Sequence, residues 1–160
     1  MTKPSSLKSR LVRMMAVTVL TTSAIGGISF AINSTNVSAA RATTADIKLN
    51  QEQAVKRFHR QFKDAKVTEI TLEPKGSRYQ YQIDGFDKDQ EYTAAINAKT
   101  GKIRWSHSTK LDHDDKYYAL DLDKTISRQD ATKLAENEAK QGKAQRWKMK
   151  NDDGQQVWEV

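Results

Sequence analysis

The chain has 160 residues, with 27 Lys and Arg against 20 Asp and Glu, a formal charge of +7 and no cysteine. This length accommodates one ordinary domain or two very small ones, which excludes a large multidomain enzyme. The absence of cysteine excludes disulfide frameworks, thiolate metal sites, iron–sulfur clusters and thiol nucleophiles. A hydrophobic content of 37% with 29% charged residues is polar, but it is sufficient for a folded core.

Residues 1–39 have the pattern of a secretory signal peptide. Four cations and no acid precede an apolar run from Met14 to Ile32, and small residues follow up to Ala39. This order indicates export, with cleavage expected after Ala39 or Ala40. An uncleaved anchor is the alternative, since about 19 residues just span a bilayer, but a pair of glycines weakens such a span. We therefore expect a secreted or cell-surface protein whose only membrane contact would be this segment, if it were uncleaved.

The net charge changes when the leader is removed. The leader holds four cations and no anion, so the rest of the chain has 23 basic and 20 acidic residues and a charge of +3. These charges are interspersed, with no basic run free of acids, as on an ordinary solvated surface. We therefore expect no nucleic-acid partner.

After a flexible lead-in at residues 40–47, the pattern predicts a helix and then short strands. A capping box at Asn50 and Gln53, followed by apolar residues at helical spacing, predicts an amphipathic helix over residues 51–63. Alternating apolar residues between turns then predict strands within residues 67–72, 79–83, 92–96 and 103–105. Such a meander cannot bury its apolar face alone, so we expect the helix to lie across it.

Four aromatic residues alternate along these strands: Tyr79, Tyr81, Tyr92 and Trp105. They could form a surface platform for a sugar or peptide, or they could form the core between the sheet and the helix. We favour the core, because this part of the chain has few other large apolar residues.

The pattern returns after 77 residues. Residues 126–160 align without a gap on residues 49–83, with Trp158 at the position of Tyr81. The agreement of helix cap, helix face and strand alternation indicates an internal repeat. The second copy reaches only its second strand. It could dock on the first copy, be completed by a partner strand, or be shortened relative to its relatives; we favour shortening, because an open apolar edge promotes aggregation.

Three segments resemble the PepSY family: the helix NQEQAVKRFHRQFKDAKVTEITLE, the strand YQYQIDGFD and the hairpin EYTAAINAKTGKI. The last segment looks like the closing hairpin of the family, a strand ending in a D/N-A-x-T-G-x-I turn. The resemblance covers residues 48–105 and, in part, 125–160, with a charged linker at 106–124. It implies an α+β fold in which a small helix packs on an antiparallel β-meander, with one complete copy and a partial second copy.

The resemblance also implies a non-catalytic, extracytoplasmic module. PepSY domains occur in propeptides of secreted metallopeptidases, with a proposed inhibitory or chaperone-like role, and in surface proteins of Gram-positive bacteria. We therefore expect this chain to bind or inhibit a secreted metallopeptidase, or another extracellular peptide partner, in trans. The alternative is a structural module of the cell envelope that its basic residues hold near anionic wall polymers, an attraction that +3 makes weak.

The residues offer little for catalysis. His59 lies on the predicted helix with no acid at helical spacing, as expected of a surface or boundary histidine. A second cluster could supply oxygen and imidazole ligands to a divalent cation: Asp112, His113, Asp114 and Asp115. We favour a solvated acidic linker there, because specific metal sites hold their ligands on ordered elements. We expect neither enzyme activity nor a cofactor.

Partner binding is expected along the sheet, since an exposed edge can pair with an extended segment through backbone hydrogen bonds. The outward-facing candidates beside the sheet are Thr93, Asn97, Lys99 and Lys102. Tyr117 and Tyr118 have no periodic context. They could precede a short strand at the start of the second module, or they could be exposed contacts for a partner.

Overall fold

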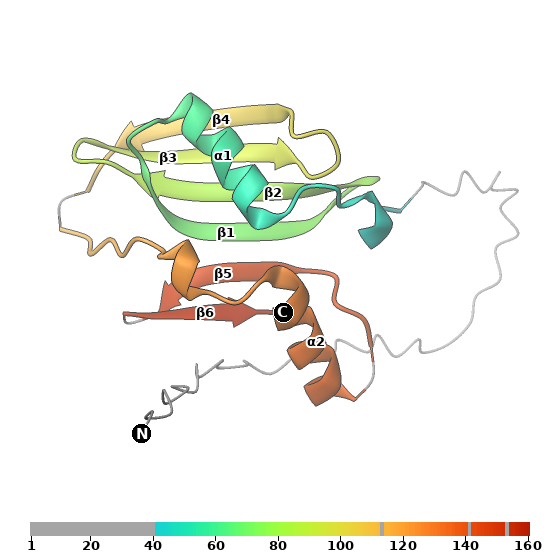
Figure 1. Cartoon of the computed structure of the whole chain (residues 1–160). Helices are drawn as coiled ribbons and strands as arrows, with labels where there is room; N and C mark the ends of the chain where they lie inside the picture. The colour runs from blue at the N-terminus through green and yellow to red at the C-terminus, as the bar shows by residue number, and fades with distance from the viewer. Residues whose placement is uncertain (1–40, 113, 141, 153) are drawn as a thin grey trace, which may run out of the picture.

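The computed structural model describes residues 41–160 except 113, 141 and 153. Two helices lie on one face of a six-stranded antiparallel sheet with the strand order β4-β3-β2-β1-β5-β6 (Figure 1). The helices and strands are α1 (Gln51–Gln61), β1 (Lys66–Lys75), β2 (Arg78–Phe86), β3 (Gln90–Asn97), β4 (Ile103–Lys110), α2 (Arg128–Ala139), β5 (Trp147–Asp152) and β6 (Gln155–Glu159). This is the predicted α+β class. The predicted signal peptide and its cleavage site lie outside the described residues.

The start of α1 is fixed by its cap. The Oδ1 of Asn50 accepts the N–H of Gln53 at 2.8 Å, and the Oε1 of Gln53 accepts the N–H of Asn50 at 3.0 Å, as a capping box requires. The helix ends at Gln61, two residues earlier than predicted, because Phe62 has left the helical region (φ −130°, ψ 82°). This departure lets the Phe62 ring stack on Tyr92 of β3, with centroids 4.4 Å apart.

The strands β1 to β4 form the predicted meander, and its apolar face lies under α1. The largest buried side chains on this face are Ile70, Leu72, Tyr79, Tyr81, Ile83 and Ile96. Gly85 of β2 lies directly beneath Phe58 of α1. A Cβ at Gly85 would be 2.7 Å from the carbonyl oxygen of Lys66 and 3.1 Å from the Phe58 ring, so only glycine allows this close approach.

The fourth strand differs from the prediction in length and in the side chain that faces the core. It continues to Lys110, into the segment where the linker was expected, because its residues pair with β3. These added residues are polar and show no apolar alternation from which a strand could be predicted. The predicted core position of Trp105 is wrong, since this side chain is 47% exposed. A register shift at Ala95/Ile96 places Trp105 opposite Ala95, on the face without helices.

The second half of the chain docks on the first. Strand β5 pairs with β1 in the antiparallel sense, so the two halves share one continuous sheet. Docking, one of the three possibilities considered from the sequence, is therefore observed, while completion by a partner strand and shortening stay predictions. Thr71 pairs with Lys148, which lies 77 positions further along the chain. The two strands therefore pair at two residues, Thr71 and Lys148, that the 77-residue sequence alignment treats as equivalent.

Hydrogen bonds also recur at this offset. The Tyr81 hydroxyl donates to the carbonyl oxygen of Leu49 at 2.8 Å, and the Trp158 indole N–H donates to that of Ile126 at 3.1 Å. Both partners of the second bond lie 77 residues after those of the first. Ser127 caps α2 by accepting the N–H of Asp130, as Asn50 caps α1. The second helix and hairpin therefore repeat the local contacts of the first.

The lead-in and the linker both contact the folded part of the chain. A short 3-10 helix, Thr44–Asp46, lies in the lead-in, and Asp46 forms a 2.8 Å ion pair with Lys99. In the linker, Tyr117 donates to Glu91 at 2.5 Å and its ring lies 5.1 Å from that of Phe86, so it is an internal contact. Across the described residues, neither helix is long and apolar enough to cross a membrane.

Candidate partner-binding surfaces

The four outward-facing candidates have different surroundings and do not converge. Thr93 lies on the face without helices and donates to Asp84 at 2.6 Å. Asn97 holds the turn after β3, since its Oδ1 accepts the backbone N–H groups of Lys99 and Thr100. Lys99 is paired with Asp46, whereas Lys102 is exposed. As a binding site, this set stays a prediction.

The predicted cation ligands lie in an exposed turn after β4. Asp112, Asp114 and Asp115 are exposed, and the Oδ1 of Asp112 accepts the N–H of Asp114 at 3.0 Å. His113 lies outside the described residues. Within the part of the chain that is described, no three metal-ligating side chains come together.

Neither of the two described histidines belongs to a group of three metal-ligating side chains among the described residues. A ring nitrogen of His59 lies 3.0 Å from the carbonyl oxygen of Ala65, so this partly buried side chain helps to join the end of α1 to β1. His107 is exposed on β4, opposite Thr93 of β3. His59 therefore has the boundary position expected from the sequence.

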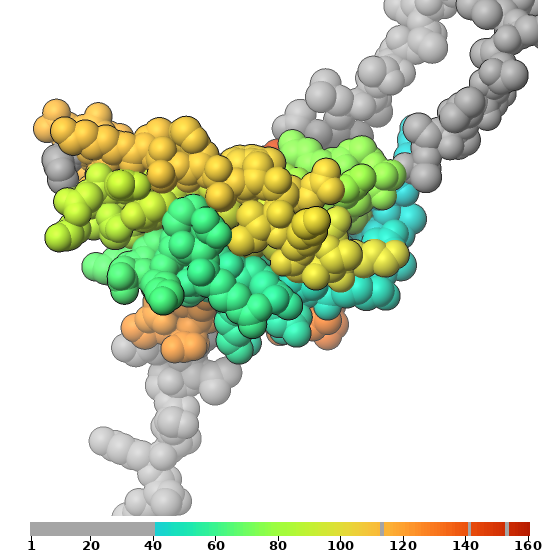
Figure 2. All heavy atoms as spheres, turned by 90° about the horizontal axis from the view of Figure 1, so that it is seen from above, coloured from blue at the N-terminus to red at the C-terminus, as the bar shows by residue number. Residues whose placement is uncertain are grey.

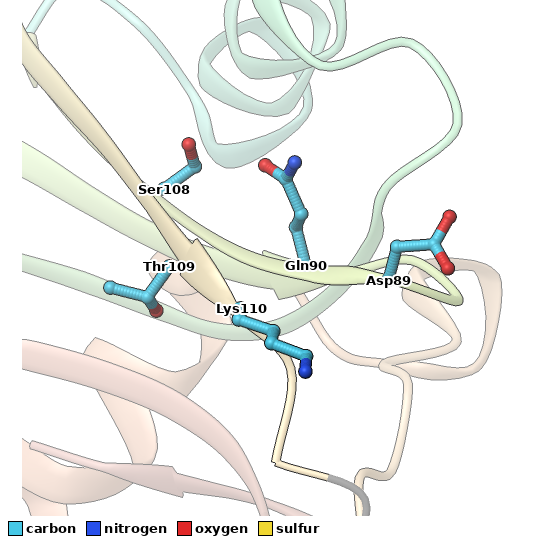
Figure 3. A pocket seen from close by; sticks show the side chains of 5 residues that line it. All are labelled: Asp89, Gln90, Ser108, Thr109 and Lys110. Atoms are coloured by element: carbon cyan, nitrogen blue, oxygen red, sulfur yellow. The ribbon is translucent and has the colours of Figure 1, made fainter.

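A hollow of about 350 Å³ lies where β3 begins and β4 ends. It is lined by Asp89, Gln90, Ser108, Thr109 and Lys110 (Figure 3). The Gln90 and Ser108 side chains point to one side of the strands, whereas Lys110 points to the other (Figure 3). A catalytic site requires side chains that converge on one point. These side chains diverge.

A smaller hollow of about 210 Å³ lies where the first turns of α1 and α2 meet. Arg128 lines it, and its guanidinium stacks over the Trp147 ring at 4.9 Å, while its buried Nε has no hydrogen-bond partner among the described residues. Burial raises the pKa of the nearby Tyr81 to about 12, against the opposing charge of Arg128. This hollow is part of the junction between the two halves.

The face of the sheet without helices is polar and largely self-paired. Lys148 contacts Glu69 and Lys150 contacts Glu159, each at 2.8 Å. Asp84 lies among these residues, and burial raises its pKa above the ordinary value, against the lowering effect of hydrogen bonds from Thr93 and Gln82. These paired charges suit the part of the face around β1, β5 and β6 to water, whereas Trp105 is exposed further along the same face, on β4.

The edges of the sheet are the remaining surfaces. Among the described residues, β4 pairs only with β3 and β6 pairs only with β5. All of β4 except Ile103 is exposed. In β6, Val157 and Trp158 are both buried, and Trp158 belongs to the core under the helices. Either edge offers unpaired backbone groups to an extended segment.

The comparisons with known proteins agree with this fold. Residues 48–104 match the profile of the family described as "Peptidase propeptide and YPEB domain". This profile is that of the PepSY domain. The matched residues contain α1, β1, β2, β3 and the first residues of β4. No curated protein matches the chain.

A solved structure resembles more of the chain than the PepSY domain alone. It is the crystal structure of a protein from Clostridium difficile that is assigned as a lipoprotein, with a TM-score of 0.64 and 25% sequence identity. The likeness covers 70% of this chain and 76% of that chain. Since the PepSY match spans about a third of this chain, the shared fold extends beyond the PepSY domain.

Sequence reasoning missed two features of these surfaces. The exposed position of Trp105 depends on a strand irregularity that apolar periodicity does not reveal. The edge position of β6 depends on the pairing of β5 with β1. The 77-residue repeat carried a signal for the second feature, because equivalent strands can pair about a two-fold axis.

Proposed function

We propose that this chain is a non-catalytic, extracytoplasmic module that binds an extended segment of a secreted peptidase, or of another extracellular protein, and lowers peptidase activity. The PepSY match supports the connection to peptidases, because the family description names peptidase propeptides. The leader pattern supports export, as does the likeness to a protein assigned as a lipoprotein.

The observation that carries the proposal is the edge formed by β6. At the 77-residue offset, β6 corresponds to β2, and β5 corresponds to β1. In the first half, β2 pairs with β1 on one side and with β3 on the other. The side of β6 that corresponds to β3 carries no strand among the described residues. An extended partner segment added there would repeat the β2–β3 pairing.

The helix above this edge indicates the side chains that such a segment should carry. In the first half, Phe58 of α1 and Phe62 just after it cover the strands, whereas α2 has Ala135 and Ala139 at the equivalent positions. Smaller helix residues leave more room for the strand beneath them. We expect bulky apolar residues at alternate positions of the bound segment, facing α2, and backbone hydrogen bonds along β6.

The test uses residues 41–160, which contain every element of the sheet and its core. Under this proposal, the protein lowers the activity of a secreted metallopeptidase in a dose-dependent manner. Hydrogen exchange of the complex supplies a control within the same chain, since the amides of β6 should exchange more slowly on binding and those of β4 should not change.

Two results would contradict the proposal. Retention on cell walls at low salt, with no effect on proteolysis, would favour a structural role in the envelope. Inhibition with protection confined to β4 would keep the peptidase partner, but it would move the binding site to the opposite edge.

A further inference from the structure

The two halves of the folded chain differ in charge. Residues 41–110 contain 14 basic and 9 acidic side chains, whereas residues 111–160 contain 9 basic and 11 acidic ones. The positive charge outside the leader therefore belongs to the PepSY half. If the net positive charge were distributed evenly, the second half would also be positive, but it is slightly acidic.

Much of this charge lies along α1 and is not neutralised. Lys56, Arg57 and Arg60 belong to α1, and Lys63 follows it. Among the described residues, none of these four has a carboxylate oxygen within 4.0 Å. The second half differs, since six of its cations are in ion pairs: Lys124, Lys133, Lys143, Arg146, Lys148 and Lys150.

The four cations share one side of the molecule. Lys56 and Arg60 follow the i, i+4 spacing, which places them on the outward side of α1, and the exposed Lys63 lies two residues beyond the end of the helix at Gln61. Arg57 lies over the β3–β4 turn, because a Cβ at Gly101 would be 3.0 Å from its Nε. The exposed Lys102 follows this glycine. Figure 2 shows α1 beside this turn.

We call Lys56, Arg57, Arg60, Lys63 and Lys102 the α1 cationic face. The acids nearest to it in the sequence are Glu52, in the first turn of α1, and Asp64, after Lys63. They leave a surplus of cations on this side. We propose that the α1 cationic face binds a linear phosphate polymer.

The chemistry of the face favours phosphate. Arginine binds phosphate oxygens in a bidentate manner, and several cations on one side of the molecule suit a chain of repeating negative charges. The face also lacks an apolar anchor. The apolar residues of α1 are buried, and the large exposed hydrophobic side chains lie elsewhere, as Trp105, Tyr118 and Leu134. Protein partners and membranes commonly engage such anchors, whereas a polyanion does not need them.

The second helix has Lys133 and Lys140 at the positions of Lys56 and Lys63, but it shows that the fold does not require the two arginines. At the 77-residue offset, Leu134 and Asn137 of α2 stand at the positions of Arg57 and Arg60. Both helices begin with a side-chain cap and lie on the same face of the sheet. The arginines of α1 are therefore available for a partner, and substitution on its outward side should leave the fold intact.

The test is a titration of residues 41–160 with poly(glycerol phosphate) at several salt concentrations. We expect the binding constant to fall with salt with a logarithmic slope of about −3, for roughly four phosphate contacts. The double variant Lys56→Gln/Arg60→Gln should halve this slope and weaken binding about tenfold at low salt. The matched control, Lys116→Gln/Lys133→Gln, loses the same net charge from exposed sites in the second half, and it should bind as the unmodified protein does.

Circular dichroism and thermal unfolding should show that both double variants are folded. The proposal is overturned if the two variants lose affinity equally, because net charge alone would then explain binding. It is also overturned if vesicles of phosphatidylglycerol bind and the soluble polymer does not, or if polyglutamate binds as tightly as the phosphate polymer. The first of these two results would indicate a membrane surface, and the second an acidic polypeptide.

Discussion

The side-chain oxygen of Gln51 accepts a 3.1 Å hydrogen bond from the backbone N–H of Arg128. Each residue is the first of its helix, and they lie 77 positions apart. This bond satisfies one of the N–H groups that a helix N-terminus leaves unpaired, and it joins the two halves above the β1–β5 pair. Gln51 is one of two buried polar residues among those described.

The first prediction concerns this joint. Gln51→Ala should lower the free energy of unfolding by about 1–2 kcal/mol, because a part-buried N–H loses its partner. Urea unfolding measures the change. The control is Gln61→Ala, an exposed position at the other end of α1, which should stay within about 0.5 kcal/mol. Equal effects of the two variants would show that Gln51 does not join the halves.

A second prediction concerns the bond between Tyr81 and Leu49. Tyr81→Phe removes a buried hydroxyl and should destabilise the protein by about 1 kcal/mol, because the Leu49 carbonyl loses its donor. Tyr118→Phe is the matched control, since Tyr118 is 46% exposed. Thermal unfolding distinguishes the two. A Tyr81→Phe variant as stable as the control would argue against this bond.

The third prediction tests the contact between α1 and β2. Gly85→Ala should cost about 1–3 kcal/mol, because the added methyl group meets the Lys66 carbonyl oxygen and the Phe58 ring. Denaturant unfolding gives the value. Gln80→Ala, on the opposite face of the same strand, serves as the control. If Gly85→Ala were neutral, α1 could not lie as close to the sheet as described.

The fourth prediction is a pair of opposite pH dependences. Burial raises the pKa of Asp84, so the folded state holds its proton more tightly than the unfolded chain. The stability that Asp84 contributes should therefore fall as the pH rises from the ordinary value of 3.8 through the raised pKa. Relative to the unmodified protein, Asp84→Asn should become more stable over this range.

Asp87 should behave in the opposite way. Hydrogen bonds from Tyr92 and from the backbone N–H groups of Asp89 and Gln90 lower its pKa. The stability that it contributes is present above 3.8 and is lost as the pH falls through the lowered pKa. The advantage of the unmodified protein over Asp87→Asn should therefore shrink in acid. Urea unfolding across the pH range measures both variants, and slopes of the same sign would contradict these assignments.

Local features of the fold could be predicted because neighbouring residues carry them. The capping box of Asn50 and Gln53 and the alternation of Tyr79, Tyr81 and Ile83 specify a helix start and a strand. The contact between Tyr117 and Glu91 could not be predicted in this way, because the two residues are 26 positions apart and Tyr117 has no periodic context. The candidate edge at β6 was foreseen only as an unfinished sheet.

The sequence by itself determined the order of helix and strands and the match of residues 48–104 to the PepSY profile, since both depend on residue type and spacing, and it predicted the 77-residue repeat. Only the tertiary structure decided that β5 would pair with β1, that Trp105 would face solvent and that β6 would form an edge. Strand pairing joins residues far apart in the chain, and a single bulge reverses the face that a side chain occupies. Both depend on the packing of the whole sheet, which no local pattern encodes.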